Sequence, residues 1–108
     1  MDLFSCPVKV TADVISGKWK PLIIVALKPG PLRYGEVRKQ VPGSTHKVLT
    51  QQLRQLERDQ IISRKVYAQV PPRVEYSLTT YGWTLTPVLQ SMADWGIKHA
   101  RRGDKLKA

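Results

Sequence analysis

The sequence predicts a small α+β domain, mostly helical, in which a helix-turn-helix and a two-stranded β-hairpin lie between helices at the two ends of the chain. Three observations support this fold class. Residues 44–58 carry leucines at helical spacing on one side and cations, amides and hydroxyls on the other. A Pro-Gly turn at residues 42–43 separates them from another short helical pattern. Residues 61–67 and 74–78 are rich in β-branched and aromatic side chains, which is typical of strands.

The chain is strongly basic and its length fits one domain. Its 108 residues include 18 Lys and Arg against 8 Asp and Glu, a net charge of +10, which favours nucleic acid or an anionic membrane surface as partner. The longest apolar run, residues 22–27, is far shorter than the ~18 residues that a membrane-spanning helix needs, and no signal-peptide pattern opens the sequence. The single cysteine, Cys6, cannot form a disulfide within the chain, which favours the cytoplasm.

The N-terminal part predicts two helices. Residues 7–15 have Pro7 in the first turn and end before Gly17, and so short a helix needs a partner for its apolar side. Residues 18–27 are apolar all round and predict the central buried helix, in which Pro21 is tolerated because it lies in the first turn. The Lys-Pro-Gly-Pro stretch at residues 28–31 ends this helix.

The helix-turn-helix follows a very short strand expected at residues 32–34. Residues 35–41 predict a short helix that Pro42 and Gly43 end, and the next helix begins at Ser44 or Thr45, whose hydroxyl can accept an N–H of the first turn. Arg and Lys can donate to guanine and Gln can pair with adenine, so the polar face predicts a recognition helix. An ordinary helix with a solvated basic face is the alternative on the pattern alone. The side chains predicted to contact DNA from this helix are Thr45, His46, Lys47, Thr50, Gln51, Arg54 and Arg58.

The two strands predict a protruding wing, because the link at residues 68–73 is too long for a tight hairpin and its prolines cannot pair in a ladder. Thr79 is expected to begin a last helix that reaches about residue 100 and that Pro87 bends. Apolar side chains along this helix alternate steps of four and three, the spacing of a surface that packs against another helix. Residues 101–108 are predicted to be a basic, flexible tail after a domain of residues 1–100. The wing and backbone contacts to DNA are predicted at Arg33, Arg64, Lys65 and Arg73.

Helix, helix, helix-turn-helix, wing and terminal helix is the order of a winged helix-turn-helix. The segments SGKW (16–19), GPLRYGEV (30–37), LTQQLRQLE (49–57), VPPRVEYSLT (70–79) and WGIKH (95–99) resemble the HxlR family of bacterial transcriptional regulators, in the MarR-like superfamily. The resemblance implies a homodimeric regulator, often a repressor, whose first and last helices form the dimer contact. A dimer of this kind implies a pseudo-palindromic operator in double-stranded DNA. The expected dimer residues are Val8, Ala12, Ile15, Leu85, Val88, Met92, Trp95 and His99.

The chain departs from the family pattern at both ends of the recognition helix. Ser44, Thr45 and His46 stand where members carry an apolar residue, Ser and Pro, so the usual hydrophobic staple is absent. Asp59 and Gln60 stand where Asp-Gly usually follows the helix, and a left-handed C-cap without Gly should cost on the order of 1 kcal/mol.

Cys6 has two interpretations. The resemblance implies a redox or electrophile switch, which would require an intersubunit bond or an adduct because no second cysteine is available. The alternative is a small residue packed at the dimer edge or idle on the N-terminal arm. No pattern predicts an enzyme, a metal site or a cofactor: Glu36 stands where a phosphate loop would need Lys, and His46 and His99 are too far apart for a local metal motif. A basic RNA-binding protein and a winged-helix protein-interaction module remain the alternative functions.

Overall fold

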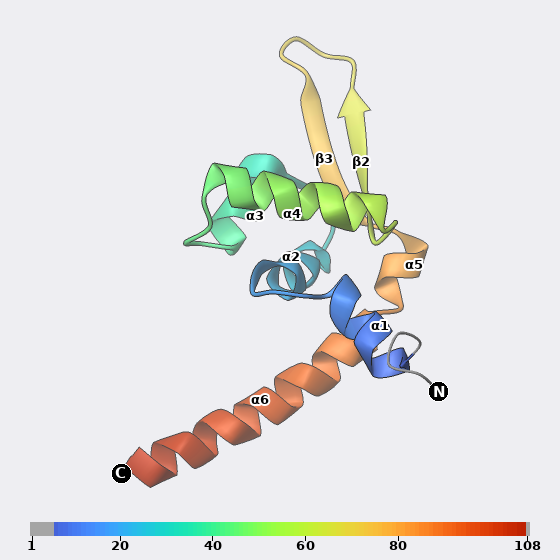
Figure 1. Cartoon of the computed structure of the whole chain (residues 1–108). Coiled ribbons are helices and arrows are strands. Elements are labelled where there is room, and N and C mark those ends of the chain that lie inside the picture. The colour runs from blue at the N-terminus through green and yellow to red at the C-terminus, as the bar shows by residue number, and fades with distance from the viewer. Residues whose placement is uncertain (1–5, 108) are drawn as a thin grey trace.

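A computed structural model describes residues 6–107 of the chain, with side chains described as far as Gly103. It confirms the winged helix-turn-helix (Figure 1). The helix-turn-helix and the wing lie together, and the long C-terminal helix extends away from them on the other side of the molecule. The elements are α1 (Pro7–Val14), α2 (Trp19–Leu27), β1 (Leu32–Arg33), α3 (Tyr34–Gln40), α4 (His46–Arg58), β2 (Ile62–Tyr67), β3 (Arg73–Leu78), α5 (Thr80–Trp83) and α6 (Thr86–Lys107).

The core lies where α2 packs against α3 and α4. The predicted leucine stripe of α4, formed by Leu49, Leu53 and Leu56, is at most 1% exposed. Burying a leucine side chain stabilises a fold by roughly 1.5–3 kcal/mol. Three such residues on one side of α4 therefore hold its opposite, polar face outward.

The sequence predicts that α2 is buried on all sides, but the structure leaves one side of the helix exposed. Ile23, Ile24 and Leu27 are buried, but the side chains of Leu22 and Val25 are 45% and 50% exposed. A domain of this size has too few elements to surround a helix completely. The prediction of a wholly buried helix is therefore wrong on one face.

The wing is part of a three-stranded antiparallel sheet with strand order β1-β3-β2. The predicted strand β1 pairs with β3 through Leu32 and Tyr76, so it ties the helix-turn-helix to the wing. The ladder between β2 and β3 runs from the Ile62 and Leu78 pair to the Tyr67 and Arg73 pair. Arg73 is thus the first residue of β3 and not part of the link, which shortens to residues 68–72. The hairpin is anchored at its base and projects from the body (Figure 1).

The turn after α4 has the left-handed residue that the sequence predicts. Gln60 has φ 63°. Its N–H donates to Glu57 O at 3.0 Å, and the N–H of Ile61 donates to Leu56 O at 2.9 Å. These two bonds form a Schellman motif, in which the strained position usually holds glycine.

The single terminal helix predicted from Thr79 is two helices. Thr79 accepts the N–H of Gly82 at 2.8 Å and caps the four-residue α5, and a turn at Thr84 and Leu85 precedes α6. Pro87 lies in the first turn of α6, where its missing N–H costs nothing, so the chain breaks before the proline and does not bend at it.

Helix α6 continues to Lys107. The last helix therefore runs beyond its predicted end at about residue 100, and the flexibility of this basic tail stays a prediction. Gly103 costs about 1 kcal/mol relative to Ala in a helix, but a helix that has already formed gains one hydrogen bond with each added residue. Arg101, Arg102 and Lys105 are good helix formers, and they favour this continuation.

Candidate nucleic-acid interface

The start of α4 is fixed by a side-chain cap. Thr45 Oγ1 accepts the N–H of Val48 at 3.1 Å, which identifies Thr45 as the capping residue. Ser44, the other candidate, is buried and its hydroxyl donates to Val41 O at 3.2 Å. The hydroxyl oxygen of Thr45 thus accepts a hydrogen bond within the protein, while the side chain remains exposed beside His46 and its O–H can still donate.

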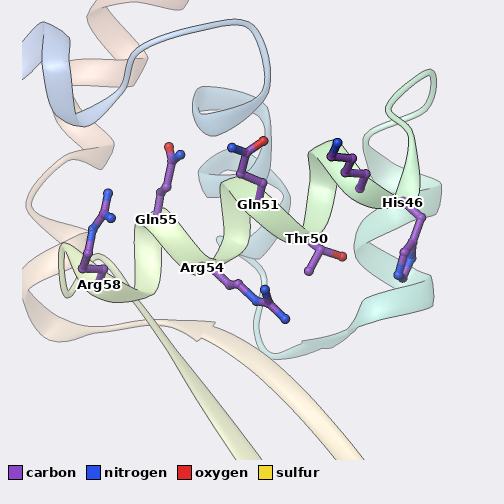
Figure 2. Close-up of a pocket in the computed structure, with 7 residues that line it drawn as sticks. His46, Thr50, Gln51, Arg54, Gln55 and Arg58 are labelled. Carbon is purple, nitrogen blue, oxygen red and sulfur yellow. The ribbon is translucent and has the colours of Figure 1, made fainter.

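The polar face of α4 carries two rows of side chains (Figure 2). His46, Thr50 and Arg54 point to one side of the helix axis, whereas Gln51, Gln55 and Arg58 point to the other. Members of a row are spaced by three or four residues, which places them one above the next on a helix surface. With Lys47 they line one open hollow, and none of the seven is acidic. The sequence prediction omitted Gln55, whose i+4 spacing from Gln51 is the signal that could have included it.

A second hollow lies between α4 and the wing. It is lined by Thr50, Arg54, Glu57, Arg58, Arg64 and Tyr76. Arg64 Nε lies 3.4 Å from Glu57 Oε2, so the carboxylate partly balances a cluster of three guanidinium groups. The structure thereby brings Arg64 of the wing next to the polar face of α4, and the DNA contacts at both places stay predictions.

Tyr76 is a residue of this hollow that sequence reasoning missed. It stands opposite Arg64 in the β2 and β3 ladder. Burial raises the pKa of its phenol above the ordinary value of 10.0, and Glu57 also raises it, while Arg64 and Arg54 act in the opposite direction. The phenol is therefore protonated at neutral pH and can donate a hydrogen bond to an anion.

The cations near the end of the wing rest on an aromatic ring. Lys65 Nζ lies 4.8 Å from the centroid of the Tyr67 ring, and the guanidinium carbon of Arg73 lies 4.0 Å from it. Arg73 Nε is also 3.8 Å from Glu75 Oε2 and forms no hydrogen bond. Lys65 is exposed, whereas the side chain of Arg73 is only 29% exposed. The side chain of Arg73 is thus less exposed to a DNA backbone than the side chain of Lys65.

Arg33, the remaining predicted backbone contact, is exposed at the start of α3. Its N–H donates to Glu36 Oε1 at 2.8 Å, which leaves its guanidinium outside the helix cap. In the sheet it stands opposite Glu75.

The predicted dimer residues lie in three neighbouring places, and Ile15 belongs to two of them. Ile15 and Leu85 are half-buried against the core of their own chain. Val8, Ile15, Val88 and Met92 line one apolar hollow where α1 and α6 lie side by side (Figure 1). Farther along α6, the rings of Trp95 and His99 stack with centroids 4.9 Å apart. The exposed members of the predicted set are Val8, Ala12, Val88, Met92, Trp95 and His99.

Cys6 stands at the N-cap of α1, where it is half-buried and makes no side-chain capping bond. Its thiol is free. Neither of the two interpretations of Cys6 is tested by this geometry.

Over residues 6–107, no helix is both long and apolar enough to cross a membrane. The same part of the chain contains no group of three or more His, Cys, Asp or Glu side chains placed to hold a metal ion.

Comparison with known proteins agrees with this geometry. The model of the HxlR-like helix-turn-helix family matches residues 14–104. YdeP of Bacillus subtilis, named an uncharacterized HTH-type transcriptional regulator, is 53% identical over 107 residues, which cover 99% of this chain and 84% of the relative. The redox regulator HypR in its reduced form has a TM-score of 0.87 at 45% identity, covering 93% of this chain and 99% of HypR. The oxidised form of HypR has a TM-score of 0.81 at 49% identity, with 86% and 96% covered.

These relatives are named as regulators. The family match, the relatives and the basic recognition helix agree, and the chain belongs to the HxlR-like helix-turn-helix family.

Proposed function

We propose that this chain is a sequence-specific DNA-binding transcriptional regulator that acts as a homodimer, with α4 in the major groove of its operator. The observation that carries the proposal is the outer face of α4, where seven cationic, amide, hydroxyl and imidazole side chains line one hollow without an acid. The buried leucines on the opposite side of α4 hold this face outward. The alternatives, an RNA-binding protein or an interaction module without DNA binding, find no support in the family match.

Within this function, base readout and backbone anchoring fall to different side chains. Gln51 and Arg54 project from the exposed face of α4 and suit base edges, with Lys47 nearer the helix start. Arg64 and Lys65 project from β2 and suit phosphates beside the groove. Phosphate contacts fix the position of a protein on DNA without specifying sequence.

The dimer would form through α1 and α6. Val8, Met92 and Trp95 are 77%, 48% and 67% exposed, an amount of apolar surface that a second copy of the chain would cover. A two-fold dimer presents two copies of α4 and therefore favours a pseudo-palindromic operator. We expect the bound dimer to repress transcription in the cytoplasm by occupying DNA that the polymerase needs.

We expect Cys6 to be the residue through which this regulator responds to oxidants, since the chain is similar to the redox regulator HypR. An oxidant such as diamide would accept two hydrogens from two Cys6 thiols, one on each chain, and an intersubunit disulfide would form. Diamide should then weaken operator binding by the wild type and leave Cys6→Ser unaffected. Equal loss in both proteins, or none in either, would show that Cys6 is not the sensor.

The experiment that tests the function starts from an operator, found by mapping protected DNA around the protein's own gene and its divergent neighbour. Affinities for this operator and for random DNA are then compared for the wild type, Arg54→Ala and Arg64→Ala. Arg54→Ala should cost about 1–3 kcal/mol on the operator and less on random DNA, because a base-specific donor pair is removed. Arg64→Ala should weaken both equally and reduce the salt slope by about one for each phosphate that is no longer neutralised. If Arg54→Ala loses equal affinity for the operator and for random DNA, α4 contributes only electrostatic attraction and does not read the sequence.

A further inference from the structure

One hydrogen bond joins the two helices of the helix-turn-helix at the outer end of the recognition face. The hydroxyl of Tyr34, the first residue of α3, lies 2.7 Å from Nδ1 of His46, the first residue of α4. The two rings meet edge to face, with centroids 5.1 Å apart and planes at 68°. The second ring nitrogen of His46, Nε2, is not part of this bond.

Contacts within the protein hold both partners of the bond in place. Tyr34 is half-buried and packs against the hydrophobic core. The backbone at His46 is held by the Thr45 cap, where Thr45 Oγ1 accepts the N–H of Val48. The imidazole of His46 is therefore tied at one nitrogen to a rigid support, and its ring is exposed at the head of the row that continues to Thr50 and Arg54 (Figure 2).

The direction of the bond depends on the tautomer of His46, and an acceptor on the DNA at Nε2 would favour one direction. In the described part of the chain the Tyr34 hydroxyl has no partner other than His46. A neutral imidazole has one N–H and one acceptor nitrogen. If the Tyr34 hydroxyl donates to Nδ1, the ring proton of a neutral His46 must be on Nε2. The Tyr34 O–H and the His46 Nε2–H can then both form hydrogen bonds when an acceptor lies near Nε2. If Nδ1 donates instead, Nε2 becomes an acceptor and cannot bond to phosphate oxygens or to the N7 and O6 of guanine, which only accept.

We propose that Tyr34 is a positioning residue for DNA binding: its hydroxyl donates to His46 Nδ1, so that the neutral imidazole presents Nε2–H to an acceptor on the DNA. This inference rests on the proposed DNA-binding function and adds to it a residue that does not itself touch DNA. Tyr34 is the titratable group that faces His46 from α3, and Lys47 and Arg54 line the same hollow from α4.

A double-mutant cycle with Tyr34→Phe and His46→Ala tests the proposal. Tyr34→Phe keeps the ring and its packing and removes only the hydroxyl. We expect operator affinity to fall about three- to tenfold in Tyr34→Phe, the range of one hydrogen bond, with no further effect of Tyr34→Phe in the His46→Ala background. Tyr81→Phe, the same chemical change at a residue that is 62% exposed on α5, is the matched control and should bind like the wild type.

Nitrogen-15 NMR of His46 without DNA gives a readout that a merely structural role would not move. At about pH 8, where free imidazole is neutral, the wild type should show a protonated Nε2 and an unprotonated Nδ1. In Tyr34→Phe the Nδ1 resonance should move toward that of a protonated nitrogen, while the unfolding temperature stays unchanged. A wild-type ring protonated at Nδ1 would overturn the proposal, as would an equal effect of Tyr34→Phe with and without His46.

The binding measurements on operator and random DNA distinguish a base edge from a phosphate as the acceptor. They also distinguish failure of this proposal from failure of the proposed function. A loss on the operator alone identifies a base edge as the acceptor of Nε2–H, and an equal loss on random DNA identifies a phosphate. If the wild type binds no DNA at all, the proposed function fails and the DNA contact of His46 fails with it. The NMR result would still decide whether Tyr34 sets the protonation of the His46 ring.

Discussion

Gly82 is expected to be the most sensitive glycine of the described chain, because α5 approaches the turn after α4 very closely there. The N–H of Gly82 donates to Thr79 Oγ1 at 2.8 Å, and the Thr79 hydroxyl donates to Gln60 O at 2.7 Å. The N–H of Thr79 donates to Ile61 O at 3.1 Å. A Cβ on Gly82 would overlap the Ile61 carbonyl oxygen and lie 3.0 Å from its carbonyl carbon. Gly82→Ala therefore forces α5 away from Ile61.

The cost can be worked out from these contacts. Retreat of α5 weakens the three hydrogen bonds around Thr79 and Gly82, each contributing about 1 kcal/mol, and exposes part of Ile61, which is only 2% exposed. Alanine returns up to about 1 kcal/mol through its higher helix propensity. We expect Gly82→Ala to lower the free energy of unfolding by about 2–3 kcal/mol, measured by urea unfolding at one fixed protomer concentration.

Gly35→Ala is the matched control, since a Cβ at Gly35 in α3 would meet nothing within 4 Å. It should be neutral or stabilise by up to about 1 kcal/mol. If Gly82→Ala is as stable as Gly35→Ala, the close approach of α5 to Ile61 does not constrain the fold, and the reasoning from backbone contact is refuted.

Three further outcomes follow from the structure. Gln60→Gly should stabilise by up to about 1 kcal/mol, seen as a rise in the thermal midpoint, because Gln60 has φ 63°; no rise would mean that the turn carries little strain. Met92→Glu should give a monomer in sedimentation at micromolar concentration, while Gln90→Glu, which adds the same charge on another side of α6, should stay dimeric. Because the pKa of Tyr76 is raised in the fold, its contribution to stability is complete below the unfolded value near 10.0 and is lost as pH rises through the folded pKa. Between the unfolded value near 10.0 and the raised folded pKa, the free energy of unfolding should consequently fall more steeply with pH in the wild type than in Tyr76→Phe.

The recognition helix could be predicted because its signals are local. The leucines at positions 49, 53 and 56 are buried, and the polar residues between them line the outer hollow, since both sets follow from one helical period. The left-handed C-cap could also be predicted from the sequence, because the turn that ends such a helix requires a positive φ even where, as at Gln60, the residue is not glycine. Where one element determines the outcome, the sequence pattern is sufficient.

Contacts between elements were not predictable in the same way. Tyr34 with His46, Gly82 with Ile61, and Tyr76 with the arginines of α4 each join residues from different elements. Each depends on how two elements approach, and no period within either segment encodes that distance. Arg73 illustrates the consequence: its charge predicts a DNA contact, but its position opposite Tyr67 in the ladder places it on an aromatic ring instead of fully in solvent.

The C-terminal stripe shows what a helical period leaves open. Its spacing predicts that the side chains from Leu85 to His99 are covered, but not by which surface. Leu85 and Leu89 pack on the core of their own chain, with Leu89 only 6% exposed. Beyond them α6 leaves the body of the molecule, and Met92 and Trp95 are 48% and 67% exposed (Figure 1). The stripe is continuous in sequence but divided in space. Its outer half has the composition of a buried surface, and the described residues of the chain leave it exposed. That division is the physical reason to expect a second copy of the chain against α6, on the side that carries Val88, Met92 and Trp95.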